Sequence, residues 1–117
     1  MAPQVAAPQV GFVVLYRWRV AADKEASFVA AWRRVTALMV ERRGGLGSRL
    51  HRASDGTLLA YAQWPSEEAW RAAAERNKAE VLDEDAVAAM REAIVERFDE
   101  VRLTPVADLL VPAGVVG

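Results

Sequence analysis

Hydrophobic side chains occupy both faces of the segment 11–20, which is rich in β-branched and aromatic residues. This pattern predicts a β-strand. Because successive strand residues point to opposite faces, the two sets are Phe12, Val14, Tyr16, Trp18 and Val20 on one face and Val13, Leu15, Arg17 and Arg19 on the other. Both faces are apolar in the first half of the segment, so we expect a central strand covered on both sides.

The segment after Asp23 follows a helical pattern instead, with apolar positions three and four residues apart. These positions are Phe28, Ala31, Trp32, Val35, Leu38 and Met39. Asp23 can open the helix, and Gly44 with Gly45 can end it. The apolar stripe predicts a helix that packs on a sheet.

Two apolar-rich runs, 46–53 and 58–64, flank the pair Asp55 and Gly56. This pair tolerates the positive backbone angles of a tight hairpin turn. The runs therefore predict two antiparallel strands joined by a two-residue loop.

A two-residue loop would also fix which side chains share a face of the hairpin. It would pair His51 with Ala60 and Arg49 with Ala62, and it would put Trp64 on the same face. The opposite face would carry Leu46, Leu50, Leu59 and Tyr61. Small alanines beside a His, an Arg and a Trp leave room either for a ligand or for a packed helix.

The second half of the chain predicts two helical segments and one more strand. Pro65 ends the preceding strand, and Ser66 can cap a helix. The second helical segment has Asp83 or Asp85 as its cap. Its inner stripe is Val87, Met90, Ile94 and Phe98. A last strand lies within residues 101–111, where proline predicts an edge position or a break.

The order strand, helix, strand, strand, helical region, strand is that of an α+β, ferredoxin-like split βαβ fold. In this fold an antiparallel sheet carries its helices on one face. The other face would expose Val13, Leu15 and the leucines and tyrosine of the hairpin. An exposed apolar sheet favours association, so we expect a two-fold homodimer with its sheets packed face to face.

The 117 residues carry a formal net charge of −1 and are 53% hydrophobic. They predict one cytoplasmic domain over 11–111, with a flexible arm at 1–10 and a tail at 112–117. The arm lacks the features of a secretory signal, and no apolar run is long enough to span a bilayer. Without a basic excess we expect no nucleic-acid partner, and with no cysteine and one histidine we expect no metal site.

Several stretches resemble the antibiotic biosynthesis monooxygenase family. They are residues 14–20, 44–52, 55–56 and 61–70, the last with Tyr-x-x-Trp followed by Ser-x-x-x-Trp. The resemblance implies a dimeric α+β barrel with a pocket between sheet and helices. It also implies, as in members that oxidise anthrones to quinones, a reaction with O2 that uses no flavin, metal or haem. The substrate would be an electron-rich aromatic molecule of the polyketide type.

By position, the resemblance makes Trp64 the pocket tryptophan and lets His51 face the same cavity. His51 is then the predicted proton acceptor near neutral pH, and Arg49 the predicted donor to a developing anion. The predicted substrate-binding residues are Tyr16, Trp18, Trp32, Ala60, Ala62 and Trp70. Which face of the first strand lines the pocket is left open by the sequence.

The chain departs from the quinone-forming members at Ala60, where they carry an asparagine. Ala60 lacks the amide that would bind a substrate carbonyl, and its small side chain leaves space there instead. Two alternatives to a cofactor-free monooxygenase therefore stay open. One is a non-oxidative cyclase or isomerase in the same pocket, and the other is a dimeric small-molecule-binding protein without catalysis.

Overall fold

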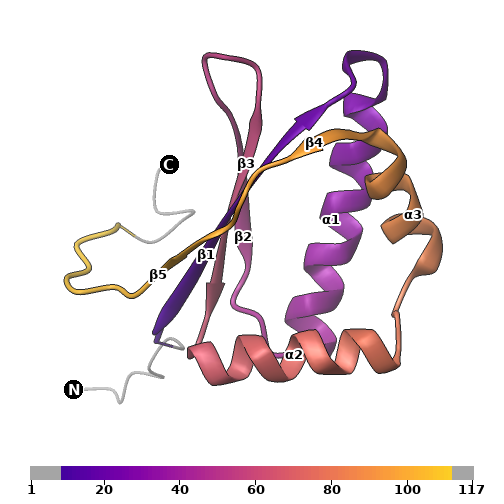
Figure 1. The fold of residues 1–117 in the computed structure, drawn as a ribbon. Coiled ribbons are helices and arrows are strands. Elements are labelled where there is room, and N and C mark those ends of the chain that lie inside the picture. Colours follow the sequence, from indigo (N-terminus) through magenta and orange to yellow (C-terminus); the bar gives the residue numbers. More distant parts are fainter. Residues whose placement is uncertain (1–8, 112–117) are drawn as a thin grey trace.

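A five-stranded antiparallel sheet forms one layer of the protein, as a computed structural model that describes residues 9–111 shows (Figure 1). Its strands are β1 (Phe12–Val20), β2 (Ser48–Arg52), β3 (Leu58–Trp64), β4 (Ile94–Arg97) and β5 (Val101–Leu103). The order is β2-β3-β1-β4, and β5 also pairs with β1. The predicted central position of β1 is confirmed. The predicted tail and most of the predicted arm lie outside the described residues.

The helices all lie on one side of the sheet (Figure 1). They are η1 (Ala22–Lys24), α1 (Glu25–Arg42), α2 (Glu67–Ala79) and α3 (Glu84–Ala93). Ser66 Oγ caps α2 by accepting from Ala69 N, and Asp83 Oδ1 caps α3 by accepting from Ala86 N, both at 3.0 Å. The α+β ferredoxin-like fold is therefore confirmed. No helix within residues 9–111 has the length and apolar character that crossing a bilayer requires.

The predicted second helical stripe ends earlier than expected. α3 stops at Ala93, and Ile94 begins β4 by pairing with Val20 of β1. Ala21 N, just after β1, donates to Ala93 O at 2.9 Å, so the backbone at the end of α3 is hydrogen-bonded to the end of the central strand. Phe98 lies beyond β4, where its ring packs 4.3 Å from the Arg17 guanidinium carbon. The prediction that Ile94 and Phe98 belong to a helix is wrong, because pairing with β1 replaces further helical hydrogen bonds.

The hairpin register also differs from the prediction by one residue. Ser48 lies opposite Ala62 and Leu50 opposite Ala60, rather than Arg49 and His51 opposite these alanines. Ala53 N donates to the carbonyl of Thr57, so the loop is the three residues 54–56. Gly56 has φ +88°, and no residue other than glycine has a positive φ within the described chain. A three-residue loop that ends in a left-handed glycine is the next most common hairpin connection after the two-residue turns.

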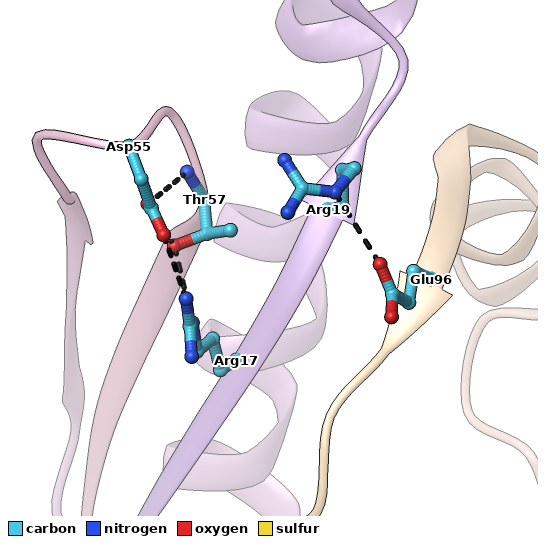
Figure 2. A network of polar contacts seen from close by, with 5 residues as sticks. All are labelled: Arg17, Arg19, Asp55, Thr57 and Glu96. Atoms are coloured by element: carbon cyan, nitrogen blue, oxygen red, sulfur yellow. Dashed lines mark hydrogen bonds and ion pairs between the residues drawn. The ribbon is translucent and has the colours of Figure 1, made fainter.

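The Asp55 carboxylate explains the longer loop (Figure 2). Its Oδ1 accepts from the backbone N–H of Thr57 at 3.0 Å and from the Thr57 hydroxyl at 2.7 Å. Its Oδ2 accepts from Arg17 Nη2 at 2.7 Å. These bonds, led by the Thr57 hydroxyl, lower the pKa of Asp55 to about 2. The side chain thus binds its own loop to the central strand and excludes the two-residue turn.

The observed register assigns the side chains of β2 to definite faces, because a shift of one residue inverts every one of them. Ser48 and Leu50 face the helices, and Leu50 packs against the core around Trp18 and Phe28. Leu59 and Tyr61 face the other side, as predicted, together with Val13 and Leu15. We call these two sides of the sheet the inner face and the outer face. Leu50 was expected on the outer face, and that expectation is wrong.

Asp55→Asn should change how stability depends on pH. The folded-state pKa of Asp55 lies below its unfolded value, so its contribution is complete above about pH 4 and is lost as the pH falls toward 2. We expect the variant to be less stable at pH 7 and to lose less stability between pH 4 and pH 2. Urea unfolding across this pH range measures both effects. Asp99→Asn is the control, since exposed Asp99 lies outside this network, and equal pH profiles for Asp55→Asn and the wild type would contradict the assignment.

Candidate active site

A cavity of about 420 Å³ lies between the inner face of the sheet and the helices. Its walls are mainly aromatic and aliphatic. All six residues predicted to contact a substrate line it, namely Tyr16, Trp18, Trp32, Ala60, Ala62 and Trp70. Trp64 of β3 lines it as well. The side of β1 that faces the cavity, left open by the sequence, is the one that carries Tyr16 and Trp18.

The space in the cavity comes from the middle of β3. Ala60 lies opposite Tyr16, and Ala62 opposite Val14, so two methyl groups stand between larger residues at the two ends of the strand. Those larger residues, Leu58 and Trp64, are both buried. Ala62 is part-exposed and leaves room for a molecule on the inner face. Ala60 is buried in the core cluster with Phe28 of α1 and Ala93 of α3, so the helices pack against it.

Aromatic contacts hold the cavity walls in place. The rings of Tyr16 and Trp18 stack with their centroids 5.8 Å apart and their planes within 7°. Trp18 meets Phe28 of α1 edge to face at 5.2 Å. Phe12 contacts Trp70 of α2 at 5.6 Å. Since the last two pairs link β1 to α1 and to α2, the walls are preformed.

Tyr16 has a fixed protonation state and orientation. Trp70 Nε1 donates to Tyr16 Oη at 3.1 Å. Burial raises the pKa of Tyr16, with the Trp70 hydrogen bond opposing the shift. The phenol is therefore neutral at physiological pH. Because its oxygen accepts from Trp70, its own proton is left to donate to another oxygen.

Two further polar atoms at the cavity are buried and unpartnered. Trp64 is 6% exposed, and neither its Nε1 nor Ser48 Oγ has a hydrogen-bond partner among residues 9–111. A buried polar atom without a partner costs about 1–3 kcal/mol. Sequence reasoning missed Ser48 because the predicted register turned it outward. The alternation of Ser48 and Leu50 with the more polar Arg49 and His51 is the signal that could have placed it inward.

His51 and Arg49 do not join this group. Both are exposed residues of the outer face, and they border a groove between β2 and α1 that also includes Glu25 and Arg33. The predicted cluster of His51, Arg49 and Trp64 is therefore not formed within one chain, because the three-residue loop inverts β2. The expectation that His51 faces the cavity is wrong for the same reason.

Asn77 and Asp83, two further polar residues at the cavity, are engaged in hydrogen bonds. Asn77 Oδ1 accepts from buried Arg43 at 2.9 Å. Asp83 accepts from Ala86 N and from Arg34, and these bonds lower its pKa. Within residues 9–111, no three His, Asp or Glu side chains come together as metal ligands. The two buried polar atoms without a partner, Trp64 Nε1 and Ser48 Oγ, can thus both donate a hydrogen bond to a ligand.

A family model described as antibiotic biosynthesis monooxygenase matches residues 11–93 of the chain. No protein of curated function shows significant sequence similarity to it. Among solved structures, a monooxygenase from the gene ActVA-Orf6 of Streptomyces coelicolor, in complex with the ligand Nanaomycin D, is 29% identical. The match covers 91% of this chain and 96% of that one, with a TM-score of 0.64.

Two more distant structures share the fold. SnoaB, a cofactor-independent oxygenase from Streptomyces nogalater, is 19% identical, with 86% of this chain and 98% of that chain covered and a TM-score of 0.66. A dimeric ferredoxin-like protein from an uncultured marine organism is 9% identical, with coverage of 90% and 96% and a TM-score of 0.67. At such identities the likeness concerns the fold alone.

Proposed function

The chain belongs to the antibiotic biosynthesis monooxygenase family, and we propose that it is a cofactor-independent monooxygenase of an electron-rich, anthrone-like aromatic substrate. The observation that carries the proposal is the aromatic-walled cavity whose free polar groups are donors. Its volume of about 420 Å³ lies within the range of small-molecule sites. The ligand bound to the Streptomyces coelicolor monooxygenase supports a polyketide-type substrate.

The proposed reaction converts the ring methylene of an anthrone and O2 into a ring carbonyl and water. Loss of a methylene proton gives an anion delocalised onto the ketone oxygen. This anion passes one electron to O2, and the resulting radical pair joins through a new C–O bond. The peroxide takes up a proton and then loses its remaining C–H proton as the O–O bond breaks, which releases water. The substrate supplies all four electrons, so the balance requires no external reductant.

Side chains of the cavity have two roles in this proposal. Trp64 Nε1 and the neutral Tyr16 phenol donate to substrate oxygens, which lowers the pKa of the methylene group by stabilising its anion. The released proton passes to water at the cavity mouth. The aromatic walls keep bulk water from the radical pair. The general-base role of His51 and the anion-binding role of Arg49 stay predictions from the sequence.

We expect the purified protein to convert anthrone to anthraquinone under O2 faster than buffer does. Ala62→Leu fills the space beside Trp64 and should lower kcat/KM by about tenfold or more, because the ring can no longer reach its position. Ala37→Leu makes the same change at an exposed position of α1 and should have no effect. Product formation is followed by absorbance, with and without O2.

The outcomes separate the alternatives. Rates equal to buffer would contradict the monooxygenase, and binding without any product would favour a binding protein. Turnover that persists without O2 would favour a cyclase or isomerase. His51→Gln should leave turnover unchanged, and a large loss would restore the base role predicted from the sequence.

We also propose that two copies pair through their outer faces. Leu15, Leu59 and Tyr61 make this face apolar and are only partly buried within one chain, and Leu103 of β5 continues it with 37% of its surface exposed. Val13 lies on the same face but is already buried within one chain, so the expectation that it is exposed there is wrong. Burying such a face in a symmetric contact removes apolar surface from water. The dimeric marine protein with the same fold supports this arrangement.

Light scattering on the purified protein should give twice the mass of one chain. Leu15→Glu puts a charge in the centre of the outer face, between Tyr61 and Val101, and should give single chains. Glu75→Gln, on exposed α2 surface, is the control and should remain paired. A wild-type protein with the mass of one chain would contradict the proposed dimer.

A further inference from the structure

Ser48 and Trp64 bring their unpartnered polar atoms to the same end of the cavity. Ser48 lies opposite Ala62 in the hairpin, and Trp64 follows Ala62 by two residues on the same face. The two side chains are therefore diagonal neighbours across β2 and β3, a separation that a tryptophan side chain can span. Both residues line the cavity.

Small residues lie beside these two side chains. Ala62 contributes only a methyl group, and Gly47, which also lines the cavity, precedes Ser48 without a side chain. Gly47 has φ +95°, and a Cβ built there would meet no atom within 4 Å. Both polar atoms are buried in the ligand-free protein, so a ligand oxygen meets them when the two side chains turn toward the cavity that they line.

The chemistry of the two groups defines what such an atom must be. An indole N–H can only donate, and the Ser48 hydroxyl has a proton to donate as well. One ligand oxygen with two lone pairs satisfies both donors, as a carbonyl or phenolate oxygen does. A protein does not leave two adjacent buried donors unsatisfied without cost, and no protein group within the described chain offsets it.

We propose that Ser48 Oγ and Trp64 Nε1 together bind one carbonyl or phenolate oxygen of the aromatic substrate, with Ser48 as the residue that selects oxygen-bearing ligands. The proposal rests on the proposed function for the type of substrate. It gives the chain a carbonyl anchor on β2 in place of the amide missing at Ala60. Both hydrogen bonds strengthen as the substrate oxygen gains negative charge, because hydrogen bonds to charged acceptors are the stronger ones.

The proposal predicts opposite effects of Ser48→Ala on stability and on binding. Removing a buried, unpartnered hydroxyl should leave the melting temperature of the ligand-free protein unchanged or raise it. The affinity for anthrone should fall by about 5- to 10-fold, the effect of one hydrogen bond. A purely structural serine would show a lower melting temperature instead.

Binding is measured without O2, by quenching of tryptophan fluorescence, so that it does not depend on oxidation. The probes are anthrone and dihydroanthracene, which has the same ring skeleton without the oxygen. Ser48→Ala should weaken the binding of anthrone but not that of dihydroanthracene. Ser48→Thr, which keeps the hydroxyl, should retain most of the affinity for anthrone. Ser27→Ala is the control, since Ser27 is an exposed serine of α1, and it should bind both probes as the wild type does.

A double variant tests whether the two donors share one oxygen. If they do, Ser48→Ala in a Trp64→Phe background should weaken anthrone binding less than it does alone. Equal anthrone affinities of Ser48→Ala and the wild type would overturn the proposal. So would no anthrone binding to the wild type, equal weakening of both probes, or failure of Ser48→Ala to fold.

The result also separates this proposal from the proposed function. Ser48-dependent binding of anthrone without oxidation under O2 would support the anchor and contradict the monooxygenase. Oxidation with no dependence on Ser48 would support the monooxygenase and overturn the anchor.

Discussion

The bonds of the Asp55 carboxylate to Thr57 and to Arg17 are the constraint on which the polar groups of the cavity depend. They fix a three-residue loop and with it the pairing of β2 with β3. A strand shifted by one residue would turn every β2 side chain over. Arg49 and His51 would then face the helices, and the Arg49 charge would enter an aromatic cavity. One exposed carboxylate in a loop thereby decides the chemistry of a site on the opposite face of the sheet.

The order of the elements could be predicted because each element has a local signal. The glycine pair after α1 and the caps Ser66 and Asp83 act within a few residues of the chain. The two errors concern pairing between distant residues. Ile94 fits both a helix and a strand, and only its place beside Val20 makes it a strand residue. The loop length depends on Arg17, which is 38 residues from Asp55.

The walls of the site could be predicted more fully than its polar groups. Large aromatic residues and two alanines on one face define a cavity whatever the exact register of the neighbouring strand, since β3 and β1 supply most of the sheet surface. The polar groups on β2 depend on a single-residue choice. Ser48 therefore replaces the sequence-predicted His51 at the cavity. The result is a site with hydrogen-bond donors and aromatic walls, suited to a substrate that brings its own electrons and acceptor oxygens.

Nuclear Overhauser effects between backbone protons of β2 and β3 test the register most directly. The structure predicts contacts of Ser48 with Ala62 and of Leu50 with Ala60. Contacts of Arg49 with Ala62 and of His51 with Ala60 would contradict it. That result would bring the histidine into the cavity and remove the serine from it.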